Sequence, residues 1–520
     1  MMAAKKVTGV MVVAAAAGLW MAGESQAGLV NQWKFDEGSG LVAADSVGGQ
    51  DGELQPTGDP PAWVTTNLPP VPSGTTAALQ FDENSSQLVN ALGYKGITGT
   101  NPRSMSAWIK TTSNDMEPII SWGRDTAGEK WTFRVQNQNG TAGAIRVEVN
   151  GGYVVGNLNV ADGQWHHVAA TWEDDGSPNA NDVKLYVDGA RQATSARSGQ
   201  SMNTASDEDV RIGRAVVDGR FFHGTMDEVR VYDHALSGQQ VRMLATGSPL
   251  AIPSLNYDAG LDTDGNNVWE DSVGLYATGV GLDYELTGVT RNTSPATSLP
   301  GIRASYVFDG SATAVSAGNI EDRLRGDPTD DDASFEVWFK PADLSGQEIV
   351  WEYGAGTNGT SFTLDDNLLQ VVTKDGGDSG GVAVDLTALQ GDFIQAIATI
   401  DRKTNQLAVF INGVEVAGSP VSLGSFGDWC GTNGDGLGSR GGSGTGGHGG
   451  FFGALNDYDN FVGEIAMARM YTEVLSAQDA QGLYNAVAAE EVIPEPGTFG
   501  LLGLATAGLG AYVRRRRRAA

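Results

Sequence analysis

Side chains that carry oxygen atoms are the groups of this sequence that point most clearly to a chemical role. Asp82, Asn84 and Asp227 offer carboxylate and amide oxygens, and calcium takes six to eight such oxygens as ligands. Asp and Asn also cap turns by bonding to their own backbone. Calcium binding and turn capping therefore remain two open interpretations of these residues.

Two adjacent histidines invite a second metal hypothesis. His166 and His167 follow Trp165 in a segment rich in strand-forming residues. Successive residues of a strand point to opposite faces, so the two imidazoles cannot easily share an ion. The zinc motif His-Glu-x-x-His is absent. We predict a structural role for this pair.

Catalysis of glycan cleavage would need two carboxylates on either side of the glycosidic bond. The nearest approach is Asp207-Glu208-Asp209, in which Asp207 and Asp209 alternate but Arg211 stands where a third acid would be. The run Asp330-Asp331-Asp332 is typical of a loop. We predict a solvated turn at 207–209, a solvated turn or weak cation site at 330–332, and no enzymatic activity.

Short alternating segments are the elements that must position these groups. Residues 183–187 alternate before Asp188-Gly189, and residues 407–411 do the same before Asn412-Gly413. Asp-Gly and Asn-Gly favour two-residue hairpin turns, in which both residues take positive φ. No long amphipathic helical pattern interrupts the body of the chain, so we predict an all-β fold.

An internal repeat organises these segments. Five matches occur in the same order, 224 to 239 positions apart. They pair Asp45-Ser46-Val47-Gly48 with Asp271-Ser272-Val273-Gly274, Phe81-Asp82 with Phe308-Asp309, Trp108 with Trp338, Gly189 with Gly413, and the block Phe222 to Ser237 with Phe461 to Ser476.

The repeat predicts two domains, residues 28–248 and 253–488. The increase in offset locates an insertion at Gly431 to Gly450, which is dominated by glycine. This insertion lacks the Gly-Lys-Ser/Thr ending of a phosphate-binding loop. We predict a flexible surface loop there.

Several segments of the first copy carry a family resemblance. They are Trp33 to Gly38, Ala78 to Asp82, Ser106 to Trp108, Trp165 to Ala169, Gly224 to Tyr232 and Ala235 to Ser237. Together they resemble a laminin-G-like, concanavalin A-like jelly roll. The second copy is more divergent, since it lacks the Trp-His-His segment. The resemblance implies two tandem β-sandwiches of a family whose members bind glycans or proteins, often with calcium.

The resemblance also refines the calcium hypothesis. In this family the early and late segments of the jelly roll are neighbours, which implies that Asp82 and Asp227 converge. In the second copy Asp309 matches Asp82, but Ala466 matches Asp227. Any calcium site should therefore be stronger in the first copy. Glycan hydrolases of the superfamily carry a Glu-x-Asp-x-Glu strand, and this sequence has none.

The N-terminus has the pattern of a secretory signal peptide. Lys5 and Lys6 precede an apolar run over residues 7–21, and Ser25-Gln26-Ala27 supplies small residues. This order predicts that residues 1–27 are removed by cleavage after Ala27.

The C-terminal tail, residues 489–520, has the pattern of a membrane stop. Pro494-Glu495-Pro496 precedes an apolar stretch over 497–513, which is short for a spanning helix, and then the basic cluster Arg514, Arg515, Arg516, Arg517 and Arg518. The arginines should stay cytoplasmic.

The tail resembles a PEP-CTERM sorting signal. That resemblance implies an exosortase-type transpeptidase as a partner and transient contact with the inner membrane before the tail is removed. Retention of the tail as a plain anchor is the alternative.

Charge and cysteine content limit the function further. The formal net charge is −30, which disfavours nucleic acid and anionic lipid as partners, since both require Lys and Arg to neutralise phosphates. A single cysteine, Cys430, excludes an intramolecular disulfide. The sequence favours a cell-surface or extracellular-matrix protein that binds extracellular polysaccharide or another envelope component. A polysaccharide-active enzyme and a purely structural adhesin are the alternatives.

Overall fold

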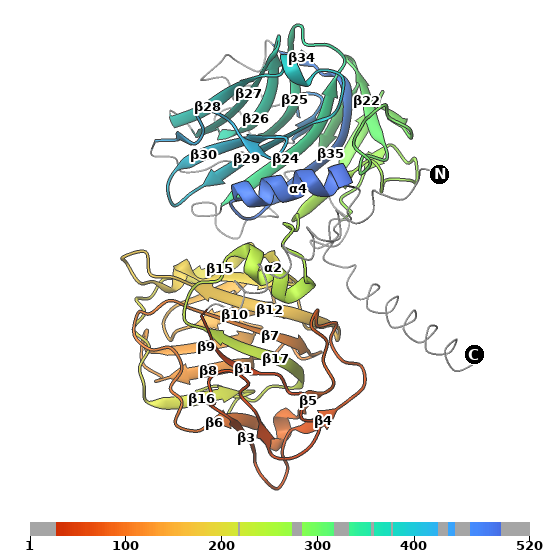
Figure 1. Ribbon diagram of the computed structural model, residues 1–520. Coiled ribbons are helices and arrows are strands. Elements are labelled where there is room, and N and C mark those ends of the chain that lie inside the picture. Colours follow the sequence, from red (N-terminus) through yellow and green to blue (C-terminus); the bar gives the residue numbers. More distant parts are fainter. Residues whose placement is uncertain are drawn as a thin grey trace, which may run out of the picture. The chain divides into compact units, whose positions relative to one another are not determined.

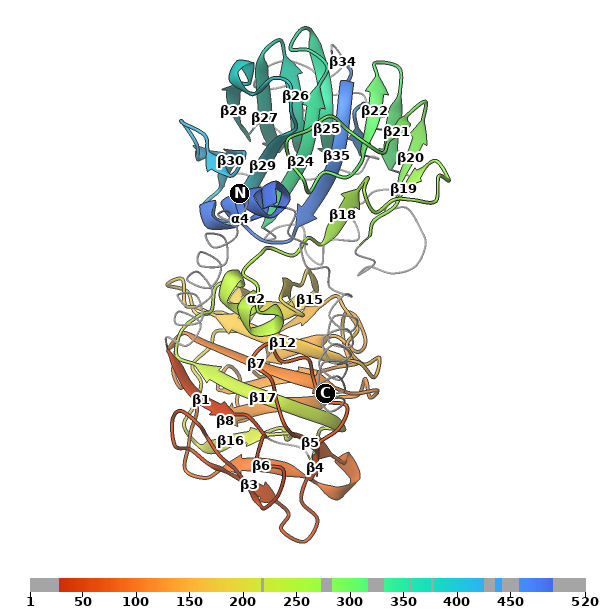
Figure 2. The same ribbon diagram turned by 45° about the vertical axis from the view of Figure 1, so that its right-hand side comes forward.

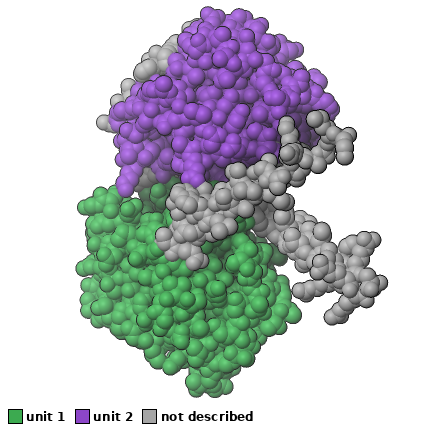
Figure 3. Space-filling view, viewed as in Figure 1, with its two compact units in different colours: residues 1–249, 498–520 green, residues 250–497 purple. Residues whose placement is uncertain are grey.

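The described residues of the computed structural model are 28–216, 219–272, 283–316, 332–354, 358–375, 378–424, 435–441 and 458–489. They are mostly β-strand, with two α-helices, α2 (Gly238–Thr246) and α4 (Ala477–Ala489) (Figure 1). The chain divides between residues 249 and 250 into two compact units (Figure 3). Unit 1 and unit 2 are described separately below.

Unit 1 contains two antiparallel sheets. The first runs in the order β14 (Ala190–Arg191), β13 (Lys184–Val187), β12 (Trp165–Trp172), β7 (Arg103–Lys110), β17 (Gly224–Tyr232), β5 (Ala78–Phe81) and β4 (Ala62–Val64), and β1 (Leu29–Trp33) also pairs with β17. The second runs β15 (Thr194–Ser198), β11 (Tyr153–Gly156), β10 (Ile145–Glu148), β9 (Lys130–Val135), β8 (Glu117–Gly123), β16 (Glu208–Ile212), β6 (Leu88–Ala91), β3 (Gly52–Gln55) and β2 (Val42–Ala43).

Unit 2 also contains two sheets. The first runs in the order β21 (Thr290–Asn292), β22 (Ser305–Asp309), β35 (Val462–Tyr471), β24 (Ala333–Pro341), β29 (Ile394–Asp401), β30 (Gln406–Ile411) and β31 (Val414–Glu415), with β18 (Leu255–Asp258) on β35 and β32 (Val421–Ser422) on β30. The second runs β19 (Val268–Trp269), β20 (Tyr284–Thr287), β23 (Thr313–Ser316), β33 (Gly436–Leu437), β25 (Gln347–Gly354), β26 (Asn358–Asp365), β27 (Leu368–Asp375) and β28 (Asp378–Asp385), with β34 (Asp459–Asn460) on β25.

The two units repeat one topology. The order β12-β7-β17-β5-β4 in unit 1 returns as β29-β24-β35-β22-β21 in unit 2 (Figure 2). The order β2-β3-β6-β16-β8-β9-β10-β11 returns as β19-β20-β23-β33-β25-β26-β27-β28. The predicted duplication and the all-β, two-sandwich fold are both confirmed.

Local turn chemistry sets the hairpins as predicted. Asp188 and Gly189 have φ of 51° and 85°, and Asn412 and Gly413 have φ of 49° and 78°. Positive φ at both central residues is the geometry that matches the twist of the adjoining strands.

Each unit has its own apolar core, in which stacked aromatic rings join two neighbouring strands. Trp122 of β8 stacks on Trp131 of β9 with ring centroids 6.2 Å apart, and in unit 2 Trp351 of β25 stacks on Phe362 of β26 at 5.9 Å. All four side chains are at most 1% exposed. Large buried rings of this kind supply much of the apolar area that stabilises a fold without disulfides.

One part of the glycine-rich segment differs from its prediction as a surface loop. Residues 436–437 form β33, which pairs with β23 and β25 inside the second sheet of unit 2. Leu437 is fully buried. Two residues among many glycines carry no visible strand pattern, because only the neighbouring strands supply the partners for their backbone. Of the remaining segment, residues 431–434 and 442–450 lie outside the described residues.

The chain ends also lie outside the described residues. This applies to the cleavage residue Ala27, to Pro494-Glu495-Pro496 and the arginine cluster, and to the apolar stretch 497–513. Within the described ranges, neither helix has the length and apolar character that crossing a membrane requires.

Candidate functional site

The structure brings two of the three predicted calcium ligands together. The backbone N–H and side-chain amide of Asn84 both donate to Asp82 Oδ1, at 2.9 and 3.1 Å. This is a capped turn that follows β5, and both side chains are exposed. Turn capping is therefore the interaction that the structure records for Asp82 and Asn84.

Asp227 lies elsewhere on the same sheet. β17 pairs with β5 so that Gly224 is opposite Phe81 and Met226 is opposite Leu79. In this register Asp227 is four positions along the ladder from Asp82, roughly 13 Å at about 3.4 Å per residue. Calcium–oxygen distances are about 2.3–2.6 Å, so one ion cannot bind both carboxylates. The strands are neighbours, as the resemblance implied, but the register separates the two residues.

Asp227 is fully buried among polar groups of unit 1. Burial is the main cause that raises the pKa of Asp227 to about 8, with a further rise from Glu228 and an opposing hydrogen bond from Thr75. The carboxyl group is therefore largely protonated at neutral pH when no cation is bound.

The two histidines have unlike surroundings. His166 Nδ1 lies 2.8 Å from Asp188 and its Nε2 lies 3.2 Å from Asp162. Burial alone would lower the pKa of His166, but these two carboxylates outweigh it and raise the pKa to about 10. His167 packs edge-on against Trp108 at 5.5 Å, and burial lowers its pKa to about 3. The pair does not form one metal site.

The acidic run at 207–209 is paired with basic side chains. Asp209 lies 2.7 Å from Lys95, Asp207 lies 3.5 Å from Arg124, and Glu208 pairs with Arg211. Glu208 and Asp209 begin β16 rather than lying in a turn. Of the run 330–332, only Asp332 is described.

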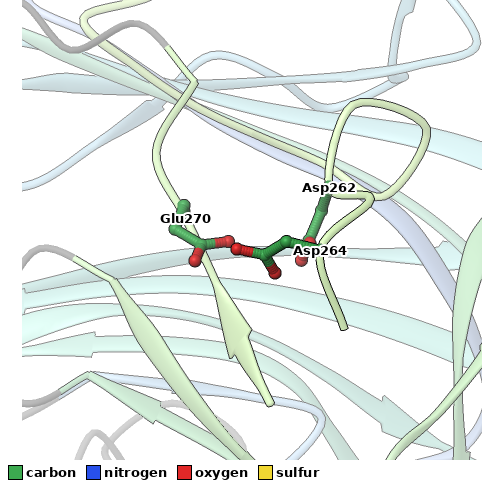
Figure 4. Close-up of side chains that lie close together, drawn as sticks. All are labelled: Asp262, Asp264 and Glu270. Atoms are coloured by element: carbon green, nitrogen blue, oxygen red, sulfur yellow. The ribbon is translucent and has the colours of Figure 1, made fainter. Parts of the chain in front are cut away.

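A cluster of three carboxylates occurs in unit 2, at residues that were not predicted as ligands from the sequence. Asp262, Asp264 and Glu270 each offer an oxygen within 4.8 Å of the other two (Figure 4). They lie in and just after the segment that leads from β18 to β19. The spacing Asp-x-Asp-x-Asn-x-x-x-Glu over 262–270 was the available sequence signal. This triad has the composition and geometry to hold a metal ion.

Hydrogen bonds orient the members of this triad. Tyr306 donates to Asp262 Oδ2 at 2.5 Å, and the amide of Asn266 donates to Asp264 at 3.0 Å and to Glu270 at 2.5 Å. Burial raises the pKa of Asp262, the Tyr306 hydrogen bond opposes the rise, and the Asp264 carboxylate adds to it. The three side chains range from buried through half-buried to exposed, so one edge of the cluster faces solvent.

A groove in unit 2 is the second feature of interest. It has a volume of about 760 Å³ and runs over the ends of β22, β24 and β35. Its polar lining includes Asp309, Lys340, Gln390 and Glu464. Asp309 is the unit 2 counterpart of Asp82 and caps its own turn, accepting from the backbone N–H groups of Ser311 and Ala312.

Comparison with protein families gives two matches. The family described as the concanavalin A-like lectin/glucanases superfamily matches residues 74–242 and 309–481. The PEP-CTERM protein-sorting motif matches residues 492–518.

Individual proteins resemble parts of the chain. A mouse protein, "Sushi, von Willebrand factor type A, EGF and pentraxin domain-containing protein 1" from Mus musculus, is 29% identical over 176 residues, which is 30% of this chain. The match spans 4% of the length of that relative, and the same is true of the rat protein of the same name.

Two solved structures resemble parts of this chain. Domain 4 of AbnA, an extracellular arabinanase from Geobacillus stearothermophilus in complex with arabinotriose, is 20% identical, with 42% of this chain and 98% of that chain covered and a TM-score of 0.33. Domains LG4-5 of the mouse laminin alpha1 chain are 12% identical, with 74% and 90% covered and a TM-score of 0.25.

Proposed function

The chain belongs to the concanavalin A-like lectin/glucanases superfamily, and we propose that it is an exported surface or matrix protein that binds carbohydrate without transforming it. The observation that carries this proposal is the combination of two lectin-like sandwiches with a sorting motif at residues 492–518. A tail of this kind addresses a protein to the envelope, and a lectin-like fold suits binding there.

Export in this proposal proceeds in two steps. A signal peptidase removes residues 1–27, and an exosortase-type transpeptidase removes the tail after transient membrane contact. The extracellular polysaccharide or another envelope component is then the ligand. The net charge of −30 fits this destination, because a strongly acidic surface keeps the protein soluble and away from anionic lipid.

Binding rather than cleavage is supported by the arrangement of carboxylates in unit 1. The alternating acids Asp207 and Asp209 are each paired with a basic side chain. A glycosidase needs one carboxyl group free to donate a proton and another free to attack or to activate water. Calcium is the cofactor that fits a non-catalytic role, because it binds oxygen ligands and stabilises loops.

The groove of unit 2 is the glycan-binding surface that we propose. Its charged side chains Asp309 and Lys340 can bond sugar hydroxyls, and a volume of about 760 Å³ accommodates a short oligosaccharide segment. Unit 1 provides a matched control, because Asp82 and Lys110 occupy the corresponding positions.

A glycan array probed with the purified chain, with and without EDTA, tests the proposal. We expect binding to at least one extracellular polysaccharide, weakened at least tenfold by Asp309→Asn with Lys340→Met and unchanged by Asp82→Asn with Lys110→Met. Absence of binding to every glycan and surface extract would contradict the proposal and favour a structural adhesin. Release of reducing sugar from envelope polysaccharide would instead establish the enzyme alternative.

A further inference from the structure

We propose that unit 2 binds one calcium ion in the segment from β18 to just beyond β19, through the carboxylates of Asp262, Asp264 and Glu270. This inference goes beyond carbohydrate binding and does not depend on it. The ion would stabilise the loop whether or not the groove holds a sugar.

Convergence of the three acids is the first observation. Their oxygens lie within 4.8 Å of one another (Figure 4), although three like charges at such distances repel one another. Among the described residues, none of the three carboxylates lies within 4.0 Å of a Lys or Arg nitrogen. Arg291, a nearby guanidinium, instead donates to the backbone carbonyl of Ala259 at 2.6 and 2.9 Å.

An unpartnered oxygen is the second, independent observation. Asp262 is only 8% exposed, and its Oδ1 is buried without a hydrogen-bond donor among the described residues. Tyr306 occupies Oδ2 alone. Buried carboxylate oxygens are normally paired, because removal from water without a partner is costly. A cation held beside Asp264 and Glu270 supplies the missing partner.

Asn266 explains how the cluster is held in shape. Its side-chain Nδ2 bridges Asp264 and Glu270, and its Oδ1 accepts the backbone N–H of Val268 at 2.8 Å. This neutral amide orients two of the acids but brings no net positive charge. It therefore reduces the repulsion without balancing it.

The donor set selects the class of ion. All three groups are hard oxygen ligands, which suit calcium or magnesium rather than zinc or copper. Acids at the first, third and ninth positions of the segment 262–270 match the irregular coordination that calcium accepts. Magnesium requires a near-ideal octahedron and keeps most of its water.

Unit 1 contains the same loop without the site. With the offset of 226 positions that relates the two Asp-Ser-Val-Gly segments, Asp264 and Glu270 correspond to Gly38 and Ala44. The counterpart of Asp262 is Asp36, whose Oδ1 accepts from Thr75 Oγ1 at 3.0 Å and from the backbone N–H of Thr76 at 2.6 Å. In unit 1, Thr75 and Thr76 therefore donate to the carboxylate oxygen of Asp36. In unit 2, the cation is the partner of the corresponding oxygen of Asp262.

Terbium luminescence of the purified chain tests the site. Terbium replaces calcium at oxygen sites, and the buried indole of Trp269, adjacent to Glu270, is the donor that sensitises it. We expect saturable emission that calcium displaces at submillimolar concentration and that magnesium displaces at least tenfold less well. Asp264→Asn with Glu270→Gln should reduce the emission at least tenfold. Glu173→Gln with Glu415→Gln removes the same charge from exposed positions and should leave it unchanged.

Calorimetric titration with calcium provides a readout that does not depend on a variant folding. We expect a binding heat with a stoichiometry of one calcium ion per chain. We also expect a higher melting temperature in calcium than in EDTA. Extracellular calcium-binding modules have dissociation constants up to about 1 mM. Absence of calcium binding at 10 mM calcium, about ten times that value, would overturn the proposal. Equal emission from the Asp264→Asn, Glu270→Gln variant with native circular dichroism would also overturn it, as would equal displacement by magnesium.

Discussion

Unit 1 and unit 2 share three neighbouring strands, β12-β7-β17 and β29-β24-β35. The units differ in the partners that the buried polar groups of these strands have. In unit 2, Glu336 of β24 accepts hydrogen bonds from Trp338, Gln395 and Tyr471 and pairs with Arg469 at 3.4 Å. In unit 1, Ser106 occupies the corresponding position on β7. A carboxylate on a different strand, Glu228 of β17, pairs with Arg230 at 2.8 Å and accepts from Gln32.

The difference has a structural consequence. Trp108 Nε1, both ring nitrogens of His167 and the Tyr232 hydroxyl have no partner among the described residues of unit 1. Their unit 2 counterparts at Trp338 and Tyr471 are both satisfied by Glu336. The duplicated framework therefore accommodates a buried carboxylate on β24 in unit 2 or on β17 in unit 1. Only the arrangement in unit 2 provides acceptors for most of the buried donors nearby.

Removal of the central carboxylate should produce the largest difference between the units. Glu336→Ala removes the closer ion-pair partner of the buried Arg469 and leaves it with Asp258, 4.0 Å away. We expect a cost of about 3–5 kcal/mol in the stability of unit 2. The control Ser106→Ala removes a hydroxyl that has no partner among described residues, so it should change unit 1 by less than about 0.5 kcal/mol. Hydrogen exchange of peptides from each unit measures both effects. Equal costs in the two units would contradict the comparison.

Alkaline pH should destabilise unit 1 selectively. The pKa of His166 is about 10 in the folded chain, against about 6.5 when unfolded, so its contribution is fully present below pH 6.5 and is lost as pH rises through 10. The linkage predicts a loss of about 2 kcal/mol between pH 8 and pH 10. In unit 2, Ile394 takes the corresponding place, paired with Phe339 as His166 is with Ile109.

The pH range above 8 isolates this effect. The pKa of Asp227 in unit 1 and that of Glu352 in unit 2 are both raised to about 8, chiefly by burial. The contribution of each carboxyl group to stability is fully present below its unfolded pKa and is lost as the pH rises to about 8. Above pH 8 it changes little. His166→Ile should abolish the remaining dependence of unit 1. Persistence of the loss in that variant would disprove the assignment.

Calcium should change the stability of unit 2 and not that of unit 1. At ten times its dissociation constant, the ion should stabilise unit 2 by about 1.4 kcal/mol and leave unit 1 unchanged. Hydrogen exchange in calcium and in EDTA, compared over 255–272 and 29–48, measures the difference. Protection of the unit 1 loop by calcium would show that its Gly38 and Ala44 positions do not prevent binding.

Substitution at the turn after β5 should have the smallest effect. Asp82→Asn retains an oxygen that can cap the turn at Asn84, so we expect a cost below about 0.5 kcal/mol and no change in calcium affinity. Thermal unfolding and calcium titration check both. A loss of calcium affinity would restore Asp82 as a ligand.

Much of the fold was predictable because its signals are local. The Asp-Gly and Asn-Gly turns required positive φ at residues 188–189 and 412–413, and the structure has it. Repetition of short motifs revealed the duplication. β33 was not predictable, because its two residues become a strand only where β23 and β25 supply backbone partners.

The site was less predictable than the fold. The sequence indicated which residues carry ligand oxygens, and the resemblance indicated that β5 and β17 are neighbours. Neither gave the register that separates Asp82 from Asp227. The acids of 262–270 were visible as a pattern, but their convergence and the buried, unpartnered oxygen of Asp262 were not.

The sequence by itself determined the duplicated all-β framework, the hairpin turns and the sorting motif of the tail, because each is encoded by neighbouring residues. Tertiary structure decided which polar groups meet. A bulge in β17 at Glu228, whose φ is 50°, aligns Asp227 with Trp108, whereas β35 places Met467 opposite Trp338. The sequence alignment had matched Asp227 with Ala466. Side chains alternate between faces of a strand, so a shift of one residue decides which groups are buried together.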